Sequence, residues 1–357
     1  MNLLRQLVAI RSSYPDEEEI SIFLIRHLRA IGFRVETQTV ARGRTNILAA
    51  KGCGKRSVLF YGHMDTVPLT NRSGWHTDPC TLTQKGNRLY GLGVYDMKGG
   101  MSAFLSACEG TSAYVKVFLA VDEENISEGA WKAVNGRKAF FRDVSLIISA
   151  EPNFGLGLHG ITTGRTGRCV FDVKFVGVPA HLAAYTAGKD AIGMLATFVS
   201  CLYRERGTMF ADTRTVLQVR KITGESVGMS VCGEASLEVE VLLDAKTSVA
   251  AVRRVLLGFG ATQVSLKERN TPYLTGYQYD QFPKMRDIGR IIQQATGRSM
   301  RVHTRTSVGD DNVLATLGIP VITWGPDGGN AHAPDEYVLR RSISALTGMY
   351  KKLLKCL

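Results

Sequence analysis

The stretch SVLFYGHMD (residues 57–65) joins an unbroken apolar run to a histidine and an aspartate. Further apolar runs are TNILAA (45–50), VKVFLAV (115–121) and VSLIISA (144–150). None of them alternates apolar with polar residues, and helical stretches such as 98–109 separate them along the chain. This pattern is typical of strands buried on both faces of a mostly parallel sheet. We therefore expect an α/β fold.

Residues that can bind a metal follow three of these runs directly, and two more follow glycine-rich turns. They are His63, Asp96, Glu123, Glu124, Glu151 and His332. Because ligands bind in the crevice beyond the carboxyl ends of the strands in an open α/β sheet, we expect the side chains to converge there. Each residue alone could cap a helix or lie on the surface. Together they predict a site, since acidic groups directly after buried strands are costly unless they are paired or coordinated.

The donor types also indicate the kind of metal. Imidazoles and carboxylates without thiolates suit zinc, cobalt or manganese, and one carboxylate can bridge two ions about 3.5–4 Å apart. The sequence has no nucleophile elbow, in which a G-x-S-x-G stretch joins a strand to a helix; its GESVG (224–228) lies between two expected strands. The pattern therefore favours attack by an activated water over a covalent acyl-enzyme.

The pattern of apolar and polar residues changes in the middle third of the chain. Alternating or strand-like runs and helical stretches follow one another at 167–178, 188–204, 215–224, 235–244, 248–258 and 262–267. This β-α-β-β-α-β order is that of a ferredoxin-like domain. After about residue 272 the pattern of the first part of the chain returns. We therefore predict a catalytic domain in two parts, 1–162 and 271–357, interrupted by an α+β domain at 163–270.

Composition narrows the function. The 357 residues are 45% hydrophobic and 21% charged, with a formal net charge of +12. The lysines and arginines are dispersed without an interleaved aromatic series, so we expect neither a nucleic-acid nor a membrane partner. Seven cysteines without a C-x-x-C pair, and a start without a signal peptide, indicate a reduced protein of the cytoplasm.

Six motifs carry a resemblance to a known family. They are YGHMDTVP, YGLGVYDMKGG, VDEENISEG, SAEPN, GVPAHLAAYTAGKDAI and AHAPDEYV, in this order between residues 60 and 338. They resemble the motifs of the dinuclear zinc aminoacylase, desuccinylase and carboxypeptidase family, which includes succinyl-diaminopimelate desuccinylase, acetylornithine deacetylase and glutamate carboxypeptidase. The resemblance implies a zinc-exopeptidase-like catalytic domain with an inserted lid and dimerisation domain, and hence a homodimer.

The resemblance also implies roles for individual residues. One ion, most simply Zn²⁺ with Co²⁺ or Mn²⁺ as alternatives, would be held by His63, Asp96 and Glu151, and the other by Asp96, Glu124 and His332. Glu123 would be the general base, Asp65 would orient His63, and His181 would stabilise the oxyanion, within one chain or across a dimer. Thr306, Asp310 and Asn312 are weaker candidates for substrate contacts. Lys246 stands where an arginine is common in the family, and a lysine cannot offer the bidentate fork of arginine to a carboxylate.

Three functions follow from this pattern. The first is a two-metal hydrolase that cleaves the amide bond of an N-acylated amino acid, such as a succinyl or acetyl derivative. The second is an exopeptidase, a carboxypeptidase or a di- or tripeptidase, acting on short peptides. The third is a non-catalytic binding protein on the same scaffold. The acyl group, the native metal and the meaning of the positive charge stay open at this point.

Overall fold

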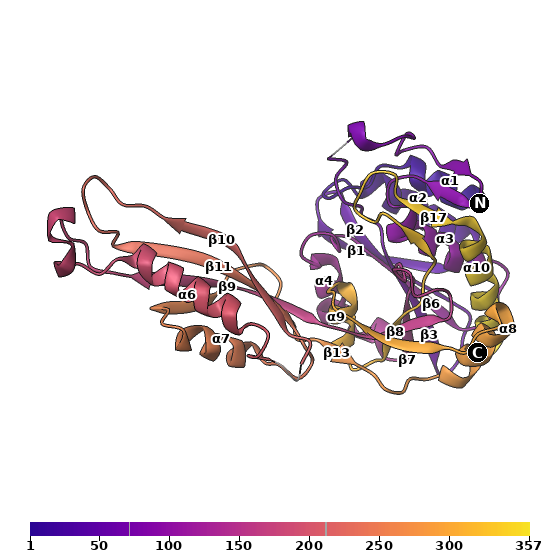
Figure 1. Cartoon of the computed structure of the whole chain (residues 1–357). Helices are drawn as coiled ribbons and strands as arrows, with labels where there is room; N and C mark the ends of the chain where they lie inside the picture. The colour runs from indigo at the N-terminus through magenta and orange to yellow at the C-terminus, as the bar shows by residue number, and fades with distance from the viewer. Residues whose placement is uncertain (71, 211–212) are drawn as a thin grey trace. The chain divides into compact units, whose positions relative to one another are not determined.

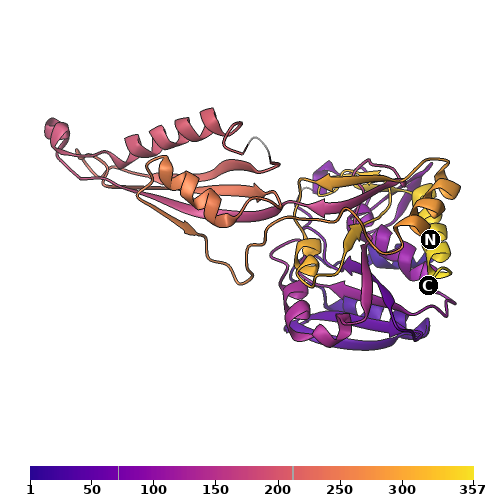
Figure 2. The ribbon, with the colours of Figure 1, turned by 90° about the horizontal axis from the view of Figure 1, so that it is seen from below.

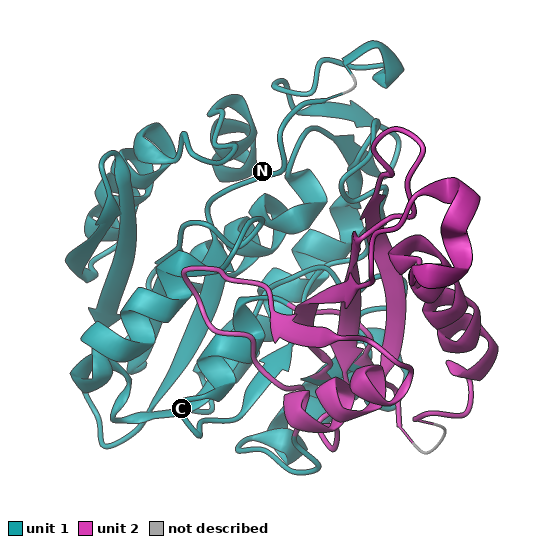
Figure 3. Ribbon diagram, turned by 90° about the vertical axis from the view of Figure 1, so that its left-hand side faces the viewer, with its two compact units in different colours: residues 1–164, 279–304, 309–357 teal, residues 165–278, 305–308 magenta. Residues whose placement is uncertain are grey.

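The computed structural model describes residues 1–70, 72–210 and 213–357. They form two compact units, coloured separately in Figure 3. Unit 1 comprises residues 1–164, 279–304 and 309–357, and unit 2 comprises residues 165–278 and 305–308. The return of the segment 305–308 to unit 2 has no counterpart in the sequence pattern. Among the described residues, no helix combines the length and the apolar character needed to cross a bilayer.

Unit 1 is built on a twisted sheet whose central strands are parallel. Its strands lie in the order β1 (Arg34–Ala41), β2 (Arg44–Lys51), β6 (Val115–Ala120), β3 (Ser57–His63), β7 (Val144–Ser149), β15 (Val321–Thr323) and β8 (Gly160–Arg165), and β14 (Arg301–Arg305) pairs with β8. Strand β3 runs parallel to both neighbours, β6 and β7, and β15 runs parallel to β7. The pairs β1–β2, β2–β6 and β15–β8 are antiparallel. The expected α/β fold with a mostly parallel sheet is confirmed.

Helices cover both faces of this sheet (Figure 1). They are α1 (Asn2–Ala9), α2 (Glu18–Ala30), α3 (Gly99–Cys108), α4 (Glu128–Gly136), α5 (Lys138–Phe141), α8 (Met285–Thr296), α9 (Asp310–Ala315) and α10 (Arg340–Leu354). Successive side chains of a strand point to opposite faces. Phe60 accordingly meets Tyr350 of α10 at 4.9 Å between ring centroids, whereas Tyr61 meets Phe118 at 5.8 Å, which in turn contacts Phe141 of α5.

The helices α4 and α5 are separated by one residue. They do not form a single helix, because Arg137 adopts non-helical φ and ψ of −126° and 32°. The preceding Asn135 and Gly136 are poor helix formers, which explains the break.

A small antiparallel sheet joins distant segments of unit 1. Its strands lie in the order β16 (Gly328–Gly329), β17 (Tyr337–Leu339), β5 (Arg88–Tyr90) and β4 (Thr83–Lys85). Tyr337 pairs with Tyr90 and Leu339 with Arg88. The sheet thereby brings the loop before β17 to the segment after β5, which contains the irregular turn η2 (Val94–Lys98).

Unit 2 is a four-stranded antiparallel sheet with two helices on one face (Figures 1 and 2). The strands lie in the order β10 (Val216–Gly224), β11 (Glu234–Leu243), β9 (Gly167–Val176) and β12 (Gln263–Leu266), and the helices are α6 (Ala191–Glu205) and α7 (Val249–Gly258). Its buried core includes Phe171, Phe198 and Val239. This is the ferredoxin-like order predicted from the alternating runs. Three short elements remain. They are η1 (Arg72–Gly74) in unit 1, and η3 (Leu182–Ala187) and β13 (Tyr277–Gln278) in unit 2.

Candidate active site

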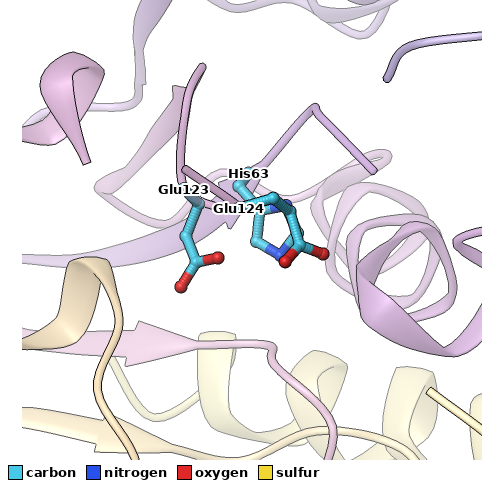
Figure 4. A group of neighbouring side chains, drawn as sticks. All are labelled: His63, Glu123 and Glu124. Carbon is cyan, nitrogen blue, oxygen red and sulfur yellow. The ribbon is translucent and has the colours of Figure 1, made fainter. Parts of the chain in front are cut away.

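The carboxyl ends of three parallel strands bring the predicted metal-binding residues together. His63 ends β3 and lies opposite Ala120, so Glu123 and Glu124 follow in the next turn of chain. Glu151 lies just beyond the end of β7, where Ser149 pairs with Tyr61. Figure 4 shows that the carboxyl groups of Glu123 and Glu124 point to different places although the residues are adjacent. The edge of the sheet therefore concentrates one imidazole and three carboxylates.

Asp96 lies between two trios of possible ligands. Its Oδ1 is 3.2 Å from Nε2 of His63, and its Oδ2 is 3.4 Å from Nε2 of His332. Nε2 of His63 is also 3.4 Å from Oε1 of Glu151, and Nε2 of His332 is 3.0 Å from Oε1 of Glu124. Within each trio, the ligand atoms lie within 4.8 Å of one another. One carboxylate thus faces both groups, so it could bridge two cations.

A third trio includes Glu123. Its carboxylate groups with His63 and Glu124 within the same 4.8 Å limit, and Figure 4 shows these three side chains. Burial raises the pKa of Glu123 well above its ordinary value, and the neighbouring charge of Glu151 adds to the effect. A carboxyl group with a raised pKa is a better proton acceptor than an ordinary one.

The electrostatics of the cluster indicate a need for positive charge. Burial disfavours the charged form of His63, yet hydrogen bonds with Asp65, Asp96 and Glu151 outweigh it and raise its pKa well above the usual value. Hydrogen bonds with Asp96 and Glu124 raise the pKa of His332 to about 11. These carboxylates therefore favour the positively charged form of both imidazoles. Two divalent cations would satisfy the same demand, and the imidazole and carboxylate donors fit them.

Asp65 supports both His63 and Glu124. Nδ1 of His63 lies 3.0 Å from the backbone carbonyl oxygen of Asp65 and 3.6 Å from its carboxylate Oδ1. The other carboxylate oxygen, Oδ2, accepts a hydrogen bond of 2.9 Å from the backbone N–H of Glu124. The nearer partner of the imidazole is thus the carbonyl group, while the carboxylate holds the turn that carries Glu124.

A buried ionic network lies behind the same turn. The Arg44 guanidinium donates to Glu17 Oε2 at 2.9 Å and Oε1 at 2.7 Å, and to Asp122 Oδ1 at 2.9 Å. The side chains of Glu17 and Asp122 are fully buried. Asp122 also accepts a hydrogen bond from the backbone N–H of Glu128 at 2.8 Å. The network therefore fixes the residue directly before Glu123, and neither Arg44 nor Glu17 stands out in the sequence pattern.

A second buried contact links Tyr61 to the candidate substrate residues. Its hydroxyl group donates to Oδ2 of Asp310 at 2.6 Å. Burial raises the pKa of Asp310 to about 7, against the lowering effect of its hydrogen bonds with Tyr61 and Ser127. Asn312 accepts a hydrogen bond from the Gly309 N–H at 3.2 Å. Both candidates, Asp310 and Asn312, are buried within unit 1 and make internal hydrogen bonds.

The other predicted residues lie in unit 2. His181 is exposed at the start of η3, and its Nδ1 accepts a hydrogen bond from the Ala183 N–H at 3.1 Å. Lys246 and Thr306 are exposed. The backbone N–H of Lys246 donates to Asp244 Oδ1 at 3.0 Å. Their accessible side chains leave them available to a ligand.

Comparison with known proteins identifies the family. The model of peptidase family M20/M25/M40 matches residues 59–355. A succinyl-diaminopimelate desuccinylase of Burkholderia ambifaria is 26% identical over 378 aligned residues, covering 99% of this chain and 97% of the relative. A desuccinylase of Paraburkholderia xenovorans is likewise 26% identical over 377 residues, with the same coverage.

Solved structures share the fold. A tripeptidase from Staphylococcus aureus has a TM-score of 0.80 at 20% identity, covering 99% of this chain and 96% of the other. A Bacillus subtilis protein described as a dinuclear metal binding peptidase has a TM-score of 0.73 at 17% identity, with the same coverage. The family match spans most of the chain and includes every residue of the two trios. The chain therefore belongs to peptidase family M20/M25/M40 and is a metal-dependent hydrolase of amide or peptide bonds.

Proposed function

We propose that this protein hydrolyses the amide bond of an N-acylated amino acid, with two bound cations and Glu123 as the general base. The observation that carries the proposal is the position of Asp96, whose two oxygens face His63 and His332 at 3.2 and 3.4 Å. His63, Asp96 and Glu151 would hold one cation, and Asp96, Glu124 and His332 the other. Zn²⁺ is our first choice, and Co²⁺ or Mn²⁺ has the same donor preferences.

The cations would supply Lewis acidity, which polarises the scissile carbonyl and lowers the pKa of the attacking water. The residues of the chain do the rest. Glu123 accepts the proton of that water and later delivers it to the leaving amine. Its raised pKa supports this role, because the group must be protonated in one half of the cycle and charged in the other. Asp65 orients His63 and the turn that carries Glu124.

Three residues of unit 2 keep the roles that the sequence predicts for them. His181 stabilises the oxyanion of the tetrahedral intermediate, from its own chain or from a second copy. Lys246 and Thr306 contact the substrate, and the ammonium group of Lys246 favours a substrate that bears a carboxylate. Asp310 and Asn312 shape the pocket from within unit 1, where their side chains are already hydrogen-bonded.

The names of the relatives support an N-succinyl amino acid as the first substrate to test. A second candidate function is cleavage of short peptides, which the tripeptidase with a TM-score of 0.80 favours. The two functions share their chemistry and differ in what the pocket accepts on the acyl side. A panel of N-succinyl and N-acetyl amino acids against di- and tripeptides, with Zn²⁺ or Co²⁺ added, separates them by kcat/KM.

The role of Glu123 has its own test. Glu123→Ala should retain two metal ions per chain and lose about 10²–10⁴-fold in kcat, because the proton of the water then has no acceptor. Metal content is measured by atomic emission in the same samples. If metal content and activity fall together, Glu123 is a ligand, as the third trio allows, and the assignment of the base is wrong.

We also propose that unit 2 pairs two copies of the chain. Among the described strands, β10 forms one edge of its sheet, and the residues Val216 and Ile222 on it are 54% and 56% exposed. An unpaired edge with exposed apolar side chains is suited to strand pairing between identical subunits. Sedimentation at micromolar concentration should give a dimer, and Ile222→Lys should shift it to monomer. A wild-type monomer contradicts the proposal.

The proposed location is the cytoplasm. All seven cysteines are free, which suits a reducing compartment.

A further inference from the structure

Glu336 makes an unusual set of contacts close to the candidate metal-binding residues. Its carboxylate Oε2 accepts a hydrogen bond of 2.6 Å from the N–H of Gly93, and its Oε1 accepts from Tyr95 at 2.7 Å and from Asp96 at 2.9 Å. The side chain is buried, with 1% of the residue exposed. One carboxylate thus satisfies three backbone donors of the segment that carries Asp96.

The fold explains why these groups meet. Strand β17 pairs with β5, and Tyr337 lies opposite Tyr90, so Glu336 is directly beside the chain that leaves β5. The carbonyl oxygen of Glu336 continues the contact by accepting from the Gly91 N–H at 3.2 Å. The small sheet therefore delivers this carboxylate to the loop 91–96, which is about 240 residues away along the chain.

The loop needs such support because its backbone is not regular. Gly93 has a φ of 70°, and a Cβ there would collide with the side chain of Thr66. Asp96 has φ and ψ of −115° and 93°, outside the helical region. Its N–H cannot join a helical ladder and donates to Glu336 instead. Burying an unpaired N–H is costly, so the carboxylate determines which loop conformation is stable.

We infer that Glu336 is a positioning residue that sets the orientation of the Asp96 carboxylate between His63 and His332. The same segment also supplies His332, four residues earlier, so one stretch of chain provides a ligand and fixes the bridge. Removing partners that orient metal ligands typically costs about 10–100-fold in metal affinity or activity. The inference rests on the proposed two-cation site.

The first test is a Co²⁺ titration followed by visible absorption, with metal content measured after dialysis. Wild type should bind two ions per chain. Glu336→Gln, which keeps the size but places an amide NH₂ against backbone donors, should bind at least one of the two more weakly, by about 10-fold or more. Glu336→Asp, which keeps the charge, should recover part of that affinity. Leu346→Ala, a core substitution in α10, is the matched control for general destabilisation and should bind both ions as wild type does.

The outcomes separate the two claims. Wild-type binding of fewer than two ions refutes the proposed function itself. Two wild-type sites that are unchanged in Glu336→Gln refute the positioning role and leave the function intact. An equal loss in Leu346→Ala also overturns the role, because destabilisation alone would then explain the effect.

A second measurement uses only the wild-type chain and so does not depend on whether a variant folds. Hydrogen exchange in the metal-free protein should find the Gly93, Tyr95 and Asp96 amides protected, because Glu336 already accepts from them. Adding Zn²⁺ should change their exchange little. Rapid exchange that slows only when the metal is added would mean that the cations, and not Glu336, organise the loop.

Discussion

The substitution Arg44→Met tests how strongly the buried ionic network supports the fold. It removes the three charged hydrogen bonds to Glu17 and Asp122 while keeping a long apolar side chain. Removing one partner of a buried ion pair typically costs about 3–5 kcal/mol, because the remaining charge is left uncompensated. Since two carboxylates lose their partner here, we expect the free energy of unfolding to fall by about 4 kcal/mol at pH 7.5. This is a large part of the total stability of a typical domain.

The pH dependence gives this prediction a sign. Burial raises the pKa of Glu17 above 4.5, and the hydrogen bond and charge of Arg44 oppose that rise. Without Arg44 the folded-state pKa rises further. A carboxyl group with a raised folded-state pKa stabilises the fold fully only below its unfolded pKa, and this stability is lost as pH rises through the folded value. The deficit of the variant should therefore be smaller near pH 5 than at pH 8.

Urea denaturation of both proteins at several pH values measures this deficit. The double variant Arg44→Met/Glu17→Gln should recover part of the loss at pH 8, because a neutral amide replaces the unpaired carboxylate. A loss in the free energy of unfolding below about 1 kcal/mol would refute the reasoning, because exposed ion pairs contribute roughly 0–1 kcal/mol and a buried pair should contribute more. A deficit that is the same at pH 5 and pH 8 would refute it as well.

Three other substitutions or treatments have simple expected results. Removing metal with EDTA should lower the melting temperature, because the clustered carboxylates lose their counter-charge, and Zn²⁺ should restore it in the same thermal scan. Tyr61→Phe should cost about 1–3 kcal/mol in urea denaturation, since Asp310 loses a buried donor at 2.6 Å; an unchanged midpoint contradicts this. Arg290→Ala should change stability by less than about 0.5 kcal/mol, because the Arg290 side chain is 67% exposed and its pair with Asp287 is open to solvent; a larger loss would mean that the pair is not merely superficial.

The sequence predicted the central fold because its signals are local. The four apolar runs became β2, β3, β6 and β7, and the alternating runs became the sheet of unit 2. An unbroken apolar run indicates a buried strand at any position in the chain, so these strands could be predicted without long-range information. The short strands β4, β5, β16 and β17 were missed, because two or three residues carry no detectable period and their pairing depends on tertiary contacts.

In the candidate site, too, local signals predicted some residues and missed those that depend on tertiary contacts. His63, Glu123, Glu124 and Glu151 could be predicted because each directly follows a recognisable strand. Arg44 and Glu336 could not be assigned a role, although both are visible in the sequence. An arginine at the start of a buried strand and a glutamate before a short strand are individually ordinary. Their importance depends on which backbone they reach, and only the sheet pairings specify that.

The buried carboxylates of Asp122 and Glu336 explain why the site and the fold of unit 1 depend on each other. Asp122, held by Arg44, precedes Glu123, and Glu336 fixes the backbone of Asp96. Both devices use internal charge to hold a turn whose backbone departs from regular geometry, as the positive φ of 75° at Asp122 illustrates. Such turns are costly unless surrounding contacts determine them. The candidate metal site at the strand ends therefore has a second set of charged residues behind it, and variants of that second set should alter metal binding before they alter substrate affinity.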